Sequence, residues 1–277
     1  MLENELKEII EKCDEDISML VKNLSRNEIL LNYNEEKIYP SASIIKIPIM
    51  IEALSKADDS QIPLLSKIKI KDSDKVDFSI ITEQNLAQCT FLELITWMII
   101  DSDNTATNVL IDLLGMDKIN ERINSLGMKS TELQRKMMDF EAIKEGKNNS
   151  TSLKDMSVAM EGLYRGKIIN KEVSKRAIDI MKNQRDNSML KRYITDNVVV
   201  ANKTGELDNL NNDVGIFYTK RSDYFIGIFV HKAQNNQKAR EIIGKLSKKV
   251  YDYFIDNQNE SSNYKLEFDY QYSMFND

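Results

Sequence analysis

Hydrophobic residues along this chain follow two periods, one typical of strands and one typical of helices. Strand-like runs lie near both ends of the chain, at 17–24, 28–33, 198–201, 214–219 and 224–231. Each end also carries an amphipathic helical pattern, from Leu2 to Cys13 and from Gln237 to Phe254. Short polar stretches at 25–27 and 220–223 separate neighbouring strand-like runs and predict tight turns.

The middle of the chain shows mostly the helical period. Helical runs are predicted at 43–54, 90–100, 105–114, 117–126, 153–164 and 170–183. Because strands come from both ends and helices from the middle, the simplest arrangement is one sheet built from both ends with helices inserted between them. We therefore predict an α+β protein, with a discontinuous α/β domain formed by 1–42 and 186–277 around an all-helical domain, 43–185.

Two stretches depart from this plan. Residues 131–150 are irregular, polar and rich in charge, and they predict a long loop of the kind that often carries function in compact domains. In the tail, 264–272, aromatic and apolar residues alternate with polar ones, which is a strand pattern. We expect this tail to add an edge strand to the sheet or to bind a partner.

Composition narrows the classes of function. The 277 residues carry 38 Lys+Arg against 44 Asp+Glu, a net charge of −6 with no basic block, so nucleic acid is not expected as a partner. No uncharged apolar run of about 18 residues occurs, so no membrane-spanning helix is expected. The acidic N-terminus does not resemble a secretory signal. We expect a monomer that is cytoplasmic, or an exported protein already stripped of its leader.

Cysteine and histidine usage excludes several kinds of site. Cys13 and Cys89 are far apart and fit no metal-ligand spacing, so free buried thiols are the simplest interpretation and no metal is expected. His231 is the single histidine, at the end of an apolar strand-like run, and the chain has no G-x-S-x-G elbow. A Ser-His-Asp triad is therefore not favoured.

One short stretch pairs a hydroxyl with an amine. Ser43 and Lys46 are three residues apart at the start of an apolar helical run, so their side chains are neighbours if the stretch is helical. A lysine kept neutral among isoleucines could take the proton from that hydroxyl, and a weak nucleophile beside a base is the arrangement of nucleophilic catalysis. The spacing alone occurs by chance in many proteins.

Two further motifs give that pair a context. Ser102-Asp103-Asn104 lies between two helical runs, and Lys203-Thr204-Gly205 follows an apolar strand. S-x-x-K, S-D-N and K-T-G in this order are the set of class A β-lactamases and penicillin-binding proteins. The chain thus resembles a class A β-lactamase-type serine hydrolase, from its first helix to about residue 256. The resemblance implies a five-stranded antiparallel sheet flanked by helices, with the active site between it and the helical domain.

The resemblance also implies a role for each motif residue. Ser43 would attack an acyl carbonyl, Lys46 would help to deprotonate it, and Ser102 would pass the proton to the leaving nitrogen. Asn104 would bind the substrate's amide side chain and orient Lys46. The K-T-G residues Lys203, Thr204 and Gly205 would hold the carboxylate of the substrate. Backbone N–H groups of Ser43 and Glu206 would form the oxyanion hole, where each donor contributes about 3 kcal/mol in acyl transfer. No metal or organic cofactor is implied.

The chain departs from the family pattern on the long loop. The family's glutamate, which activates water to hydrolyse the acyl-enzyme, is replaced by Met137, two residues after Arg135. Either Asp139 or Glu141 supplies the base from a reshaped loop, or deacylation is slow. In the second case the protein is a non-turnover penicillin-binding or sensor protein, or it acts on another amide or ester, such as a D-Ala-D-Ala peptide. The family usually carries a small residue where this chain has Glu206, whose charge would repel an anionic substrate unless it points away.

Overall fold

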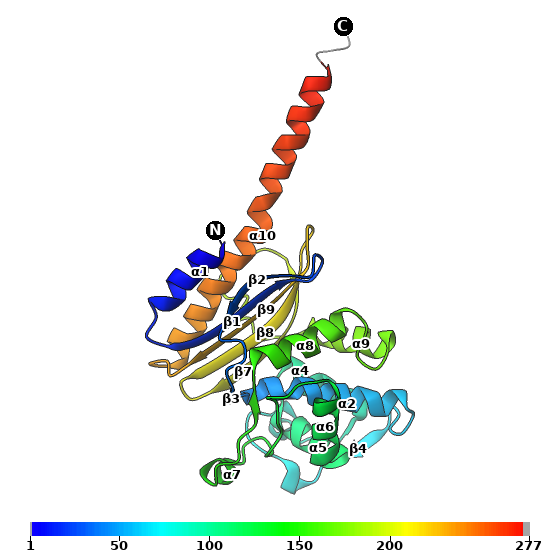
Figure 1. The fold of residues 1–277 in the computed structure, drawn as a ribbon. Coiled ribbons are helices and arrows are strands. Elements are labelled where there is room, and N and C mark those ends of the chain that lie inside the picture. Colours follow the sequence, from blue (N-terminus) through cyan, green and yellow to red (C-terminus); the bar gives the residue numbers. More distant parts are fainter. Residues whose placement is uncertain (1, 274–277) are drawn as a thin grey trace.

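The computed structural model describes residues 2–273, with side chains as far as residue 255. A five-stranded antiparallel sheet in the order β2-β1-β9-β8-β7 forms its centre (Figure 1). Its strands are β1 (Asp16–Asn23), β2 (Glu28–Tyr33), β7 (Val199–Leu207), β8 (Leu210–Tyr218) and β9 (Tyr224–His231). The two N-terminal strands pair with the three C-terminal ones through β1 and β9, which confirms the sheet built from both ends of the chain.

Helices cover both faces of this sheet. On one face α1 (Leu2–Glu11) and α10 (Asn236–Ser273) pack together over the strands, as Figure 1 shows. The other face meets α8 (Leu153–Tyr164) and α9 (Lys171–Met181). Because both faces are covered, every residue of β9 is buried, and its run of hydrophobic residues is continuous rather than alternating.

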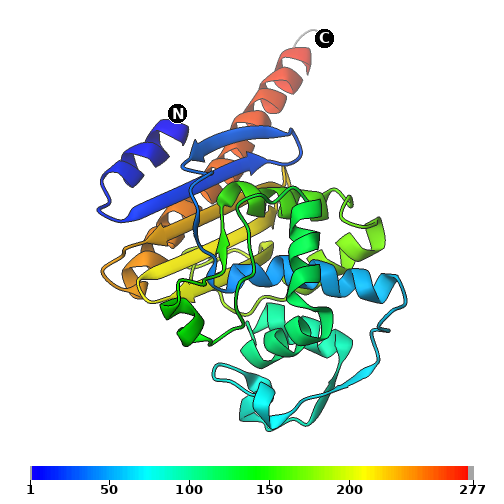
Figure 2. The ribbon, with the colours of Figure 1, turned by 60° about the horizontal axis from the view of Figure 1, so that its bottom comes forward.

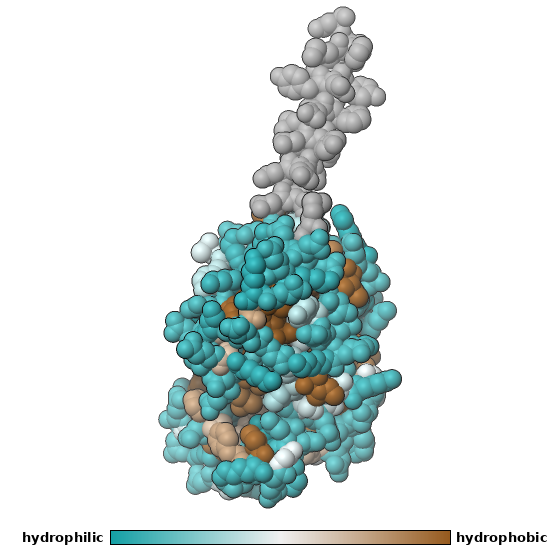
Figure 3. All heavy atoms as spheres, turned by 60° about the vertical axis from the view of Figure 1, so that its left-hand side comes forward, coloured by the Kyte–Doolittle hydropathy of each residue, from teal (hydrophilic) through white to brown (hydrophobic). Residues whose placement is uncertain are grey.

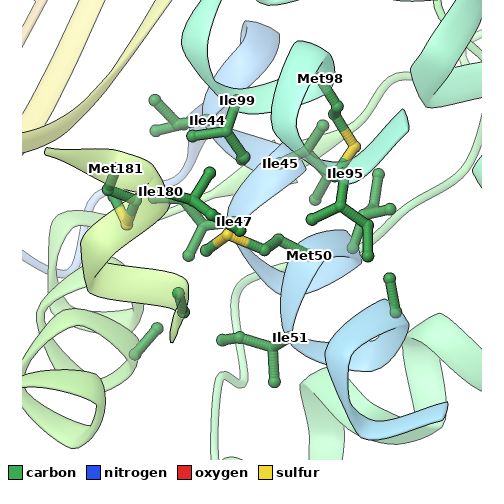
Figure 4. Packing of buried hydrophobic residues seen from close by; sticks show 14 of the residues in the cluster. Ile44, Ile45, Ile47, Met50, Ile51, Ile95, Met98, Ile99, Ile180 and Met181 are labelled. Atoms are coloured by element: carbon green, nitrogen blue, oxygen red, sulfur yellow. The ribbon is translucent and has the colours of Figure 1, made fainter. Parts of the chain in front are cut away.

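The helical part of the molecule surrounds α2 (Lys46–Asp58), and Figure 2 shows it beside the sheet. The first ten residues of α2 are all buried, as expected of a helix in the centre of a core. Figure 4 shows α2 residues Ile47, Met50 and Ile51 packed between side chains of α4 and α9. The remaining helices are α3 (Ile80–Glu83), α4 (Phe91–Ile100), α5 (Asn104–Leu114), α6 (Met116–Ser125) and α7 (Phe140–Lys144).

Short elements that the pattern did not predict interrupt the helical part. They are the pair β3 (Tyr39–Pro40) and β6 (Ser150–Thr151), the pair β4 (Lys67–Lys69) and β5 (Gln88–Thr90), and the 3-10 turns η1 (Ala42–Ile45) and η2 (Asp72–Asp74). The middle of the chain is therefore not entirely helical. The division into domains at 42 and 186 stays a prediction.

Two sheet strands are longer than their hydrophobic runs indicated. Strand β7 continues through 202–207 and β8 begins at Leu210, so the K-T-G motif lies within a strand and not after it. The polar residues there are almost completely buried in the hairpin: Asn202, Lys203, Thr204, Asn211, Asn212 and Asp213. Hydropathy alone misses these positions because their backbones pair across the ladder while their side chains find polar partners inside the protein.

Of the two expectations for the tail, the edge strand is wrong, whereas partner binding stays a prediction. Residues 264–272 are not an edge strand, because the backbone of α10 remains helical to Ser273. A strand needs a neighbouring edge for its N–H and C=O groups, whereas a helix satisfies them within itself, so alternation alone does not decide the structure. The first helix is also shorter than predicted and ends at Glu11.

The remaining features of the fold are the polarity of its surface and the state of the two cysteines. Figure 3 shows a face that is mostly hydrophilic, with hydrophobic residues in small scattered groups. Within residues 2–273, no helix is both long and apolar enough to cross a membrane. Both thiols are free: Cys89 is buried as predicted, whereas Cys13 is only half-buried.

Candidate active site

Ser43 and Lys46 lie where the turn η1 passes into helix α2. Ser43 is in the 3-10 turn and Lys46 is the first residue of the α-helix, so the prediction of one continuous helix is wrong in this detail. A 3-10 turn eclipses side chains three residues apart, which keeps Ser43 and Lys46 on the same side of the chain. Ser43 is half-buried, and Lys46 is completely buried.

The amine of Lys46 is held by the S-D-N turn. Its Nζ atom donates to the Ser102 carbonyl at 2.6 Å, to Ser102 Oγ at 3.0 Å and to Asn104 Oδ1 at 2.9 Å. Burial lowers the pKa of Lys46 well below its usual range, and the charge of Lys203 lowers it further, while Asp103 acts in the opposite direction. An amine with a depressed pKa next to a serine is a competent general base.

Ser102 connects two lysines. Its hydroxyl oxygen lies 3.0 Å from Lys46 Nζ and 3.1 Å from Lys203 Nζ. Its backbone is in the left-handed region, with φ at 57°, a costly conformation for a residue other than glycine and one that often marks a functional site. The hydroxyl is therefore positioned to pass a proton between the base and a leaving group. The neighbouring Asp103 has a structural role, because it caps α5 through the N–H of Ala106 at 2.8 Å.

Asn104 is fixed at both ends of its amide. Its Oδ1 accepts from Lys46, and its Nδ2 donates to the carbonyl of Asp77 at 3.2 Å. Phe78, which follows Asp77 in the chain, is 76% exposed, and its backbone carbonyl accepts the N–H of Asn104 at 3.3 Å. This arrangement agrees with the expected orienting role of Asn104.

Strand β7, which carries the K-T-G motif, supplies further residues of the site. Lys203 is completely buried, donates to the carbonyl of Thr204 at 2.8 Å, and has a pKa lowered by burial to about 8. Gly205 lies directly against the backbone of Ser43, since a Cβ atom at this position would be 3.0 Å from the nitrogen of Ser43. Strand β7 is at the sheet edge, so the structure brings Ser43, Lys46, Ser102 and Lys203 to one site beside that edge.

Glu206 has a partner of opposite charge. Its carboxylate accepts from Arg240 Nη2 at 2.5 Å, from Arg240 Nε at 3.0 Å and from Asn211 Nδ2 at 2.8 Å. Arg240 comes from α10, far along the chain, so the sequence pattern around the motif did not reveal this pair. The repulsion expected between Glu206 and an anionic substrate is therefore offset by a cation at the same place.

The long loop is tied to the site by two asparagines. Asn108 binds both backbone groups of Met137, accepting its N–H at 2.7 Å and donating to its carbonyl at 3.1 Å. The side chain of Asn149 binds the loop backbone at Gln134 and Arg135, while its own carbonyl accepts the N–H of Ser41 at 2.8 Å. The loop backbone is thus joined to Ser41, two residues before Ser43, and Met137 is 7% exposed.

The two candidate bases on this loop have other partners. Asp139 caps the short helix α7 by accepting the N–H of Ala142 at 3.0 Å. The Glu141 side chain is 79% exposed and pairs with Lys144 at 2.7 Å, within the same helix. The structure therefore engages both carboxylates within α7, and a base role for either receives no support from their contacts.

His231 lies away from the nucleophile. Its ring contacts the Tyr39 ring at 4.0 Å between centroids, and its Nε2 is 2.9 Å from Asn212 Oδ1. Burial lowers the pKa of His231 to about 4. Asn212 in turn donates to the carbonyl of Pro40 at 3.1 Å. The histidine contacts the segment that leads to Ser43 through Tyr39 and Asn212, and neither of these contacts involves the Ser43 hydroxyl.

Sequence reasoning missed three buried polar residues near the site: Asn108, Asn149 and Asp213. Asp213 lies across the ladder from Thr204, and its carboxylate accepts from Asn202 Nδ2 and the N–H of Leu190, each at 3.1 Å. Burial raises the pKa of Asp213 to about 7. A signal existed for Asn108, which lies one helical turn after Asn104 in an otherwise mostly apolar run.

The sequence of this chain matches those of known proteins over most of its length. A sequence model of the β-lactamase enzyme family matches residues 1–254. The β-lactamase BRO-1 of Moraxella catarrhalis is 23% identical over 271 residues, covering 91% of this chain and 85% of the relative. A β-lactamase of Proteus vulgaris is 27% identical over 228 residues, covering 79% of this chain and 76% of the relative.

Solved structures share the fold. A β-lactamase from Sphaerobacter thermophilus matches with a TM-score of 0.84 and 25% identity, covering 91% of this chain and 96% of that one. PBP-A matches with a TM-score of 0.84 and 24% identity, covering 92% of this chain and 96% of that one. These likenesses confirm the predicted antiparallel sheet with flanking helices.

Proposed function

The chain belongs to the β-lactamase enzyme family as a class A-like serine hydrolase. On that premise we propose that Ser43 forms an acyl-enzyme with β-lactams or related amides. We further propose that this ester is released slowly. The observation that carries the proposal is the buried amine of Lys46, bound by Ser102 and Asn104 and depressed in pKa. Ser43 is half-buried and precedes Lys46 by three residues, so this amine supports the assignment of Lys46 as the base for Ser43.

In the proposed acylation step each motif residue has one task. Lys46 takes the hydroxyl proton of Ser43 as Oγ attacks the carbonyl carbon, and the backbone N–H groups of Ser43 and Glu206 stabilise the oxyanion. Ser102 then delivers a proton to the leaving nitrogen, relayed from Lys46 across the 3.0 Å contact. The C–N bond breaks, the ring opens, and an ester on Ser43 remains. Lys203 and Thr204 hold the carboxylate of the substrate.

Deacylation lacks a comparable base. Water must be deprotonated before it attacks the ester, and a positioned carboxylate accelerates such a step by about 10²–10⁴-fold. The position that carries the family's glutamate holds Met137, whose thioether cannot accept that proton, and Asp139 and Glu141 are engaged in α7. The same observation favours a penicillin-binding or sensing role over rapid turnover.

Mass spectrometry after mixing with penicillin G or nitrocefin tests both halves of the proposal. We expect a persistent adduct on the wild type, none on Ser43→Ala, and an adduct lifetime shortened by about 10²-fold in Met137→Glu, since a carboxylate there supplies the missing base. Met137→Gln matches the glutamate in size without its charge and should keep the long lifetime. Glu141→Gln should also leave the lifetime unchanged.

The outcomes separate the alternatives. Absence of any adduct on the wild type contradicts acylation at Ser43 and favours an amide or ester outside the β-lactams. Rapid turnover by the wild type, with a fall in Glu141→Gln or Asp139→Asn, contradicts slow release and restores the substituted base.

A further inference from the structure

A groove on the helical part of the molecule lies between α4 and α9. Its volume is about 630 Å³, within the range of about 300–1,000 Å³ typical of small-molecule sites. The side chains that line it recur at helical spacing on the two facing helices, and Arg185 closes one end. None of the groups assigned above to acylation faces this groove, so it is separate from the site at Ser43.

The chemistry of the groove is apolar beneath and mostly cationic at the rim. Leu92, Ile100 and Ile180 give it an apolar floor. Three cations, Lys175, Arg176 and Arg185, stand against two carboxylates, Glu172 and Asp179, a local excess of +1 on a chain whose net charge is −6. This combination suits a ligand with an apolar body and one anionic group.

Among the described side chains, one of these cations has no partner. Lys175 pairs with Asp179 at 2.5 Å, and Arg185 pairs with Asp101 at 3.0 Å. Arg176 is exposed and, among the side chains that the structure describes, makes no ion pair or hydrogen bond. A guanidinium presents a planar fork that matches a carboxylate, so Arg176 is the anchor that a carboxylate ligand would use.

The groove is joined to the acylation site through a short segment. Ile100, on the floor, accepts the N–H of Arg185 at 3.1 Å, and the guanidinium of Arg185 binds both oxygens of Asp101. Asp101 directly precedes Ser102, whose strained backbone positions the carbonyl and hydroxyl that hold Lys46. A ligand that moves Arg185 therefore acts on the residue next to the proton relay.

We propose that this groove binds a small amphipathic carboxylate and that its occupancy changes the rate of acylation at Ser43 through the Arg185–Asp101 pair. The kinetic half rests on the proposed function, whereas the binding half does not. Trp97, the single tryptophan of the chain, lies under the guanidinium of Arg185 at 5.2 Å from its ring centre. Tryptophan emission therefore reports binding without any reference to catalysis.

The test is a titration of the whole protein with decanoate. We expect a saturable change in Trp97 emission, a dissociation constant raised about five- to tenfold in Arg176→Gln, as befits one charge-assisted hydrogen-bonded pair, and no change in Lys129→Gln, an exposed lysine on another part of the surface. Decanol should bind more weakly than decanoate by the same factor. Equal binding of decanol and decanoate, equal effects of the two substitutions, or an unchanged emission would overturn the carboxylate site.

The coupling is measured separately, as the rate of adduct formation with nitrocefin at increasing decanoate. We expect that rate to change in the wild type over the same concentration range as the emission. In Arg185→Gln we expect it to stay constant. Saturable binding with no change in the acylation rate of the wild type would overturn the coupling. A protein that never forms an adduct on Ser43 refutes the proposed function, and the emission titration still decides the binding site.

Discussion

The buried carboxylate of Asp213 gives a prediction about stability that can be worked out with its sign. Burial raises its pKa from 3.8 to about 7, because the ionised form has lost water and receives only two hydrogen-bonding groups in return. Between about pH 4 and pH 7 the folded protein therefore holds a proton that the unfolded chain has released. The contribution of Asp213 to the free energy of unfolding falls as pH rises through this window.

The size of the effect follows from the shift. A change of about three pKa units corresponds to about 4 kcal/mol, all of which is lost by about pH 7. Histidine 231 acts in the opposite direction, because its pKa is lowered from 6.5 to about 4 and the unfolded chain binds the extra proton there. His231 therefore adds about 3 kcal/mol as pH rises from about 4 to about 6.5. The two slopes nearly cancel in the wild type.

Asp213→Asn should expose the slope of the histidine. The amide keeps one acceptor oxygen, but its NH2 group cannot accept from a second donor as the hydroxyl oxygen of the protonated acid still can, which costs about 1–3 kcal/mol at acid pH. Relative to the wild type, we expect the free energy of unfolding of the variant to rise by about 3 kcal/mol between about pH 4.5 and pH 8, since part of the window lies below pH 4.5.

The assay is urea unfolding at several pH values. It compares the wild type, Asp213→Asn and Asp208→Asn, an exposed residue in the turn of the same hairpin. The control should show a constant difference from the wild type. A difference between Asp213→Asn and the wild type that is the same at both ends of the pH range would refute the reasoning, because the carboxylate would then carry no extra proton in the folded state.

Two further predictions concern residues of strand β7. Gly205→Ala places a Cβ 3.0 Å from the nitrogen of Ser43, so one of the two must move. We expect acylation by nitrocefin to slow by about 10²-fold, the loss that a displacement of about 1 Å at a reacting group causes. An unchanged rate of adduct formation would show that Gly205 does not position Ser43. Glu206→Gln removes the partner of Arg240, and we expect the KM for an anionic β-lactam to fall about two- to fivefold at low salt and to return toward the wild-type value at about 1 M salt, where surface charges are screened. A KM that does not respond at low salt would mean that this pair lies outside the path of the substrate.

Several features of this protein follow from the sequence without any structure. Three motifs in the family's order predict Ser43, Lys46, Ser102 and Lys203 as site residues, since each motif depends on short spacings that local backbone geometry fixes. The apolar periods located the long helices and the strands at both ends. The sequence also predicts that Met137 stands where the resemblance implies a loop glutamate, because this is a matter of residue type at a given spacing from Arg135.

Other features depend on groups that are far apart in the chain. The depressed pKa of Lys46 comes from complete burial and from Lys203, which lies 157 positions later in the sequence. Arg240, from α10, offsets the charge of Glu206, and Lys144 pairs with the candidate base Glu141 within α7. Desolvation and ion pairing arise only in the folded interior. A pattern along the chain therefore predicts which residues belong to the site, whereas the tertiary structure determines their ionisation, their partners and their positions.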